Sequence, residues 1–158
     1  MKLLDSTLLT DLSRQAAASS RLRHHLTLHN SPDETCQRLL IAMEPGTYVP
    51  PHRHLLDPKP ESLLGLRGRM ALVIFGDDGE IQQLQIFGPG EAVLGIEIPA
   101  GVWHTVVCLE SGSVLFESKP GPYRPEAPRE QAPWAPAEEM PVVASYLREL
   151  LSRITADL

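Results

Sequence analysis

Four side chains in the middle of the chain have the types and spacing of metal ligands: His52, His54, Glu61 and His104. His52 and His54 are two residues apart in an extended run, where alternate side chains point to the same face, so both imidazoles can reach one ion. Glu61 follows a proline-containing loop, and we expect an adjacent antiparallel strand to bring its carboxylate beside the two rings. His104 follows a turn at 99–101 and would complete the set from across a barrel.

Three imidazoles and one carboxylate suit Fe(II), Mn(II), Ni(II), Cu(II) or Zn(II), and they leave one or two coordination positions for water or substrate. The sequence therefore predicts one divalent metal ion as cofactor, with Fe, Mn, Ni and Zn as the main candidates. An open coordination position is what metal catalysis requires. The alternative is a structural barrel whose histidines are satisfied by hydrogen bonds, because a His-x-His pair alone is common on protein surfaces.

The elements that must position these residues are short apolar runs separated by turn residues. The runs cover residues 37–43, 47–54, 62–66, 70–75, 81–87, 92–98, 102–109 and 113–117. Glycine, proline and aspartate mark the turns between them, as at 45–46, 76–79 and 88–90. Short strands at such regular spacing favour an antiparallel sandwich or barrel.

Other elements are expected at the two ends of the chain. Leucines at helical spacing predict a helix within 3–18, with Asp5 or Ser6 as its N-cap, and a short first strand is expected at 26–30. Residues 120–141 include seven prolines and should cross the barrel surface in extended form. Residues 141–158 place apolar side chains on one helical face and predict a terminal amphipathic helix.

Two stretches resemble the motifs of the cupin superfamily. Gly46, the three residues His52, His54 and Glu61, and Gly68 are spaced as in the first motif, and residues 99–104 resemble the second. The resemblance implies an all-β fold, the cupin double-stranded β-helix or jelly-roll barrel, with short N-terminal and C-terminal helices. It implies one cupin domain over 1–158, with a core barrel at about 26–119, a wrapping segment at 120–141 and a C-terminal helix at 142–157.

A narrower resemblance, to the WbuC-type cupin metalloproteins of bacteria, covers most of the chain. The residues that carry it are 28–29, 37–38, 45–48, 51–54, 98–105, 121–123 and 134–138. Members of that family are named from surface-polysaccharide (O-antigen) gene clusters. The resemblance implies the fold and the metal, and it suggests a substrate related to sugars.

Three further residues are candidate catalytic proton carriers. Tyr48 has the parity of His52 and His54, so its hydroxyl could point into the cavity, although a packing role is the alternative. His29 and Lys59 belong to the WbuC resemblance, Lys59 standing just before the glutamate ligand.

Three other side chains are expected to take no part in the chemistry. Arg53 and Trp103 lie next to ligands in the chain and should point away from the metal. Cys108 shares the parity of His104 and is expected to be a buried, inert thiol.

Composition excludes several classes of function. Fourteen Lys plus Arg against 20 Asp plus Glu give a formal charge of −6, which disfavours nucleic acid and anionic membranes as partners. Asp5 comes too early for a signal-peptide core, and Cys36 and Cys108 form no Cys-x-x-Cys pair, so a reduced, cytoplasmic protein is expected. A small-molecule ligand and a homodimer are the expected partners.

Two functions from different classes fit these residues. The first is a metal-dependent enzyme, an isomerase, lyase or oxygenase, acting on a small polar substrate such as a sugar or sugar nucleotide of surface-polysaccharide biosynthesis. The second is a non-catalytic cupin that binds or senses a small ligand through its metal. Product formation from sugar nucleotides by the metal-loaded protein would distinguish them.

Overall fold

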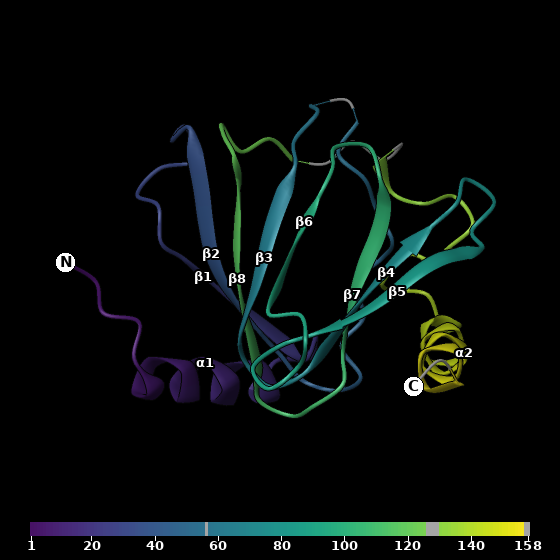
Figure 1. Ribbon diagram of the computed structural model, residues 1–158, viewed down its shortest axis with the longest axis horizontal. Helices are drawn as coiled ribbons and strands as arrows, with labels where there is room; N and C mark the ends of the chain where they lie inside the picture. Colours follow the sequence, from purple (N-terminus) through teal and green to yellow (C-terminus); the bar gives the residue numbers. More distant parts are fainter. Residues whose placement is uncertain (56, 126–129, 157–158) are drawn as a thin grey trace.

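The residues that the structure describes form eight strands, with a helix near each end (Figure 1). The computed structural model describes residues 1–55, 57–125 and 130–156. The elements are α1 (Ser6–Ala18), β1 (Arg23–Thr27), β2 (Cys36–Met43), β3 (Glu61–Arg67), β4 (Met70–Phe75), β5 (Ile81–Phe87), β6 (Gly95–Ile98), β7 (Trp103–Cys108), β8 (Ser113–Pro120) and α2 (Val143–Ala156). The expected all-β class, with short terminal helices, is confirmed.

The strands form two antiparallel sheets that face each other. The larger sheet has the order β1-β2-β8-β3-β6 and the smaller one β5-β4-β7. Consecutive strands in the chain often lie in different sheets, so the chain crosses repeatedly between the two layers, as in a jelly roll. Residues that alternate along each strand therefore point either into the space between the sheets or outward.

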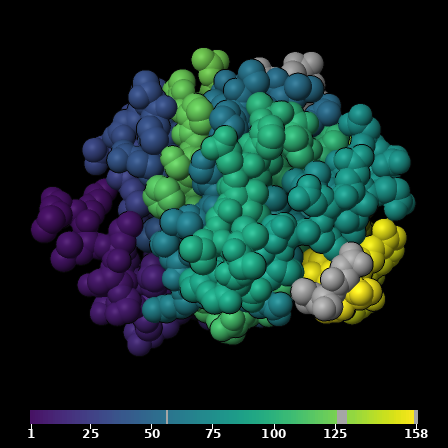
Figure 2. All heavy atoms as spheres, viewed as in Figure 1, coloured from purple at the N-terminus to yellow at the C-terminus, as the bar shows by residue number. Residues whose placement is uncertain are grey.

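Three apolar clusters hold these layers together. The first fills one end of the space between the sheets and includes Met43, Met70 and Phe87. The second lies outside the smaller sheet, where α2 packs against β4 and β7, and the third lies outside the larger sheet under α1. Figure 2 shows the two helices at opposite ends of the molecule. Because α2 covers its outer face, β4 is buried on both faces rather than in alternation.

Two strand predictions differ from the structure. Residues 47–54 form no strand, only an isolated bridge at His52. The reason is that Pro50 and Pro51 have no N–H to donate to a ladder. The first strand is β1, which begins at Arg23 and ends at Thr27, earlier than the expected 26–30.

The proline-rich segment crosses the surface without regular structure where it is described. Residues 126–129 of the predicted wrapping segment and residue 157 of the predicted helix lie outside the described residues. Glu138 forms ion pairs with Arg21, just before β1, and with Arg23, the first residue of β1. These ion pairs hold the later part of the segment against the barrel. No helix among the described residues is long and apolar enough to span a membrane.

Candidate metal centre

The structure brings the four predicted ligands together at the wall of the barrel. One ligand atom from each of His52, His54, Glu61 and His104 lies within 4.8 Å of the others. Glu61 is the first residue of β3 in the larger sheet, and His104 is the second residue of β7 in the smaller sheet. The cluster therefore joins the two layers, as expected for a ligand that comes from across the barrel.

His52 and His54 reach the cluster by a different route from the one expected. Their segment does not lie beside β3 as an antiparallel strand. Instead, the His52 N–H donates to the carbonyl of His104 at 3.0 Å, and the His104 N–H donates back to the carbonyl of His52 at 2.9 Å. Gln131, from the proline-rich segment, forms a second bridge to His52. Two of the four candidate ligands thus have directly hydrogen-bonded backbones.

Backbone carbonyls orient two of the three rings. The Nδ1 atom of His52 lies 3.0 Å from the carbonyl oxygen of Pro50, and that of His104 lies 2.9 Å from the carbonyl oxygen of Val102. A carbonyl oxygen only accepts, so both Nδ1 atoms carry protons and Nε2 remains as the coordinating atom. Hydrogen bonds of this kind commonly fix the tautomer of metal-binding histidines.

The charge state of the cluster also fits a cation. Burial lowers the pKa of His52 to about 3, so this ring is neutral and its lone pair is available near neutral pH. Burial opposes ionisation of Glu61, but its close contacts with the His104 and His54 rings and the charge of Lys119 lower its pKa well below the usual range. His104 Nε2 and Glu61 Oε2 lie only 3.2 Å apart. A metal ion would be attracted by both atoms, so the donor set fits a divalent metal.

Lys119 and Glu117 extend the site along β8, and sequence reasoning missed both. Lys119 Nζ donates to Glu61 Oε1 at 2.7 Å and forms an ion pair with Glu117 at 3.0 Å. Burial lowers the pKa of Lys119, but the two carboxylates outweigh it and raise the pKa above its usual value. Burial raises the pKa of Glu117. The sequence signal that could have found them is their spacing of two residues, which places both side chains on one face of a strand.

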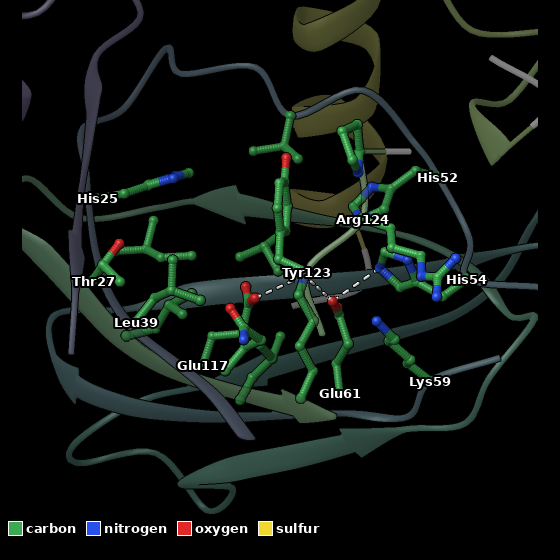
Figure 3. A pocket seen from close by; sticks show the side chains of 18 of the residues that line it. His25, Thr27, Leu39, His52, His54, Lys59, Glu61, Glu117, Tyr123 and Arg124 are labelled. Atoms are coloured by element: carbon green, nitrogen blue, oxygen red, sulfur yellow. Dashed lines mark hydrogen bonds and ion pairs between the residues drawn. The ribbon is translucent and has the colours of Figure 1, made fainter. Parts of the chain in front are cut away.

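A cavity of about 1150 Å³ opens beside the cluster, between the sheets. Its wall includes the four candidate ligands, Lys119 and Glu117, and inward-facing residues of β1 and β2. Figure 3 shows His52, His54 and Lys59 at one side of this cavity and His25 and Thr27 at the other. The volume is ample for a small polar molecule with one end on the metal.

The three candidate proton carriers occupy different positions. His29 lines the cavity, and its Nδ1 lies 3.0 Å from both the backbone nitrogen and the carbonyl oxygen of Arg38. Lys59 also lines the cavity, where it donates to the carbonyl oxygen of Pro122 at 2.6 Å and pairs with Asp57.

Tyr48 does not point into the cavity as expected. Its hydroxyl donates to the carbonyl oxygen of Pro136 at 2.8 Å, and its ring packs edge-on against Tyr146 of α2. It is not among the described residues that line the cavity. The alternation argument fails because residues 47–54 are not a regular strand.

The other side chains lie as predicted. The Arg53 guanidinium stacks 4.1 Å from the ring centroid of Trp103, away from the cluster, and Trp103 packs in the apolar cluster under α2. The Cys108 thiol is buried and lies within hydrogen-bond distance of the carbonyl oxygens of Met43 and Glu110, and burial raises its pKa.

Comparison with solved structures identifies the fold. KdgF from Halomonas sp. matches with a TM-score of 0.50 and 18% sequence identity, over 65% of this chain and 82% of KdgF. CapF matches with a TM-score of 0.53 and 20% identity, over 64% of this chain and 28% of CapF. A mutant of the oxalate decarboxylase OxdC from Bacillus subtilis matches with a TM-score of 0.50 and 19% identity, over 65% of this chain and 26% of the enzyme. These are cupin proteins, and the chain has the cupin fold.

The buried cluster of three histidines and one glutamate, within this fold, supports a metal-binding cupin. The chain belongs to the family described as Domain of unknown function (DUF6016), whose model matches residues 4–87. No curated protein matches the chain. The chain spans only about a quarter of the length of CapF and of the oxalate decarboxylase. At these identities the structural likeness establishes the fold alone.

Proposed function

We propose that this protein is a metal-dependent enzyme that acts on a small polar substrate in the barrel cavity. The observation that carries the proposal is the buried cluster of His52, His54, Glu61 and His104, whose ligand atoms lie within 4.8 Å of one another at the wall of a cavity of about 1150 Å³. A purely structural cluster would not need an open space beside it. A bound divalent ion would supply Lewis-acid chemistry there, by polarising a carbonyl or hydroxyl oxygen of the substrate.

The protein's own residues would hold and orient the substrate beside this centre. Lys119 and Glu117 form a charged pair at the cavity wall next to Glu61, within reach of a molecule bound at the metal. His29 and Lys59 also face the cavity. Lys59 is the proposed proton carrier, whereas His29 lies just beyond β1, three strands from Glu61, and is the proposed contact for the far end of the substrate. Tyr48 is left out of this set because its hydroxyl is bound to Pro136.

The finer assignment follows the WbuC resemblance. We propose a sugar or sugar nucleotide of surface-polysaccharide biosynthesis as the substrate, in an isomerase, lyase or oxygenase reaction. We also propose that residues 1–158 form one cupin domain, that the protein works in the cytoplasm and that it forms a homodimer. Sedimentation that showed only monomer at micromolar concentration would count against the dimer.

The metal is tested first, by elemental analysis of the purified protein. We expect about one equivalent of Fe, Mn, Ni or Zn per chain, reduced at least tenfold in His52→Ala and in His104→Ala, because each loses one of four ligands. His24→Ala is the matched control, since His24 precedes the inward-facing His25 and points to the other face of β1. Equal metal content in all four proteins would refute the centre.

Catalysis is tested next, by incubating the metal-loaded protein with a panel of sugar nucleotides and following product by chromatography. We expect product with wild-type protein and none with His104→Ala. Binding without turnover across the panel would favour the second function, a cupin that retains or senses a small ligand.

A further inference from the structure

The inner face of β1 is open to the cavity, the reverse of what a packed barrel requires. His25 and Thr27 point inward and line the cavity, and both are exposed. The alternate residues His24 and Leu26 point outward and are half-buried, and Leu26 packs in the cluster under α1. In a small barrel, the space in front of the inward-facing residues is normally filled by neighbouring side chains. At β1 this space is part of the cavity.

The open face lies well away from the metal centre. The sheet order β1-β2-β8-β3 puts β1 three strands from β3, which carries Glu61. Three strand spacings of about 4.8 Å give a separation of about 14 Å. The strand register forms a continuous row between them: Thr27 is opposite Leu39, Leu39 opposite Glu117, and Glu117 opposite Leu63. All four line the cavity.

Apart from Arg23, which is paired with Glu138, the side chains of this face are polar but uncharged. Partial desolvation by the cavity walls and the charges of Arg23 and Arg21 lower the pKa of His25 to about 4, so the ring is neutral near pH 7. A neutral imidazole donates one hydrogen bond and accepts another, as a hydroxyl group also does. His29, just beyond β1, adds a second imidazole to this wall. Its Nδ1 lies against the Arg38 backbone, so Nε2 is the ring nitrogen that remains for a ligand.

These side chains have few competing partners. Within the described part of the chain, neither the His25 ring nor the Thr27 hydroxyl takes part in a hydrogen bond to another protein group. The neighbouring arginines are different, because both are bound to Glu138. The uncharged groups of β1 are therefore the ones available to a ligand.

We propose that His25, Thr27 and His29 form a second subsite, which binds hydroxyl groups at the far end of an elongated, polyhydroxylated substrate whose near end lies at the metal centre. This β1 subsite rests on the proposed function, since it assumes a ligand anchored beside His52 and Glu61. The apolar Leu39 and Ile41 between the two ends offer a floor for the C–H faces of such a molecule.

The test compares two sugar acids by calorimetry on metal-loaded protein. Gluconate has a carboxylate and a neighbouring hydroxyl for the metal, and lactobionate has the same group extended by a galactosyl ring. We expect lactobionate to bind more tightly than gluconate. Thr27→Val, which preserves shape but removes one hydroxyl, should weaken lactobionate about twofold to tenfold, as for the loss of one hydrogen bond. Gluconate affinity should be unchanged.

Two further variants complete the test. His25→Ala should weaken lactobionate by a similar factor, whereas the outward-facing His24→Ala should have no effect on either ligand. Metal content is measured for every protein before titration, so a failure of the metal centre is detected separately from a failure of the β1 subsite. The subsite is refuted if lactobionate binds no more tightly than gluconate, or if the β1 variants weaken both ligands equally.

Discussion

The carboxylate of Glu138 holds the proline-rich segment against β1, and we predict that Glu138→Gln destabilises the fold. Arg23 Nη1 and Nη2 donate to the two carboxylate oxygens at 2.7 and 2.9 Å, and Arg21 donates to the same oxygens at 2.9 and 2.7 Å. The Arg23 side chain is 7% exposed and also donates to the carbonyl oxygen of Tyr48. Glutamine would remove the charge that these two guanidinium groups share.

The magnitude follows from the pKa of Glu138. Burial opposes ionisation of this carboxyl, but the hydrogen bonds from Arg21 and Arg23 outweigh it and lower the pKa from 4.5 to about 2. A tenfold change in an equilibrium constant is worth about 1.4 kcal/mol, so this difference corresponds to about 3 kcal/mol. Arg21 is largely exposed, and solvent screens its share, so we expect Glu138→Gln to cost about 2 kcal/mol at pH 7.

The lowered pKa of Glu138 also sets the direction in which its stabilising effect changes with pH. Because the folded pKa is lowered, the stabilisation is present above the unfolded pKa of 4.5 and is lost as pH falls toward about 2. Urea unfolding at pH 7, 5 and 3 should show the difference between wild type and Glu138→Gln shrinking at the lowest pH. The control is Glu139→Gln, which changes the exposed neighbouring carboxyl and should match wild type. If Glu138→Gln had the same free energy of unfolding as the wild type at pH 7, the reasoning would be refuted.

Three other predictions concern the site and the turns. Tyr48→Phe should cost about 1 kcal/mol in urea unfolding, the value of its hydrogen bond to Pro136, and leave metal content unchanged. Gly68→Ala should cost more than about 2 kcal/mol, because φ is +72° and the added Cβ would lie 2.8 Å from Ser113 Cα; a near-neutral result would contradict this. Chelation should lower the Tm of wild-type protein but not that of His104→Ala, as followed by differential scanning fluorimetry.

The fold was predictable because local signals agree along most of the chain. Glycines at the turns take positive φ values, as at Gly46 and Gly68, and seven of the eight apolar runs became β2 to β8 with small shifts at their ends. The N-terminal helix begins after Asp5, whose side chain accepts the N–H of Leu8, as the N-cap pattern predicts. These features depend on neighbours within a few residues.

The rest of the site depends on contacts between distant residues. Lys119 meets Glu61 only because β8 lies beside β3 in the larger sheet, 58 positions away in the chain. Alternation indicates which face of β8 the Lys119 side chain occupies but not which strand lies next to it. The prediction for Tyr48 was wrong for a different reason. It assumed that side chains alternate as in a strand, but the segment around Tyr48 forms no strand.

The irregular segment at residues 47–54, where the strand prediction was wrong, also positions two candidate ligands, His52 and His54. Pro50 has a fixed φ, and its carbonyl accepts the proton on His52 Nδ1 at 3.0 Å, so the ring is oriented by a rigid residue two positions away. The same backbone exchanges two hydrogen bonds with His104. A regular ladder through residues 50 and 51 would require N–H groups that proline lacks. The prolines thus prevent a regular strand at 47–54, and the Pro50 carbonyl orients the His52 ring toward the cluster.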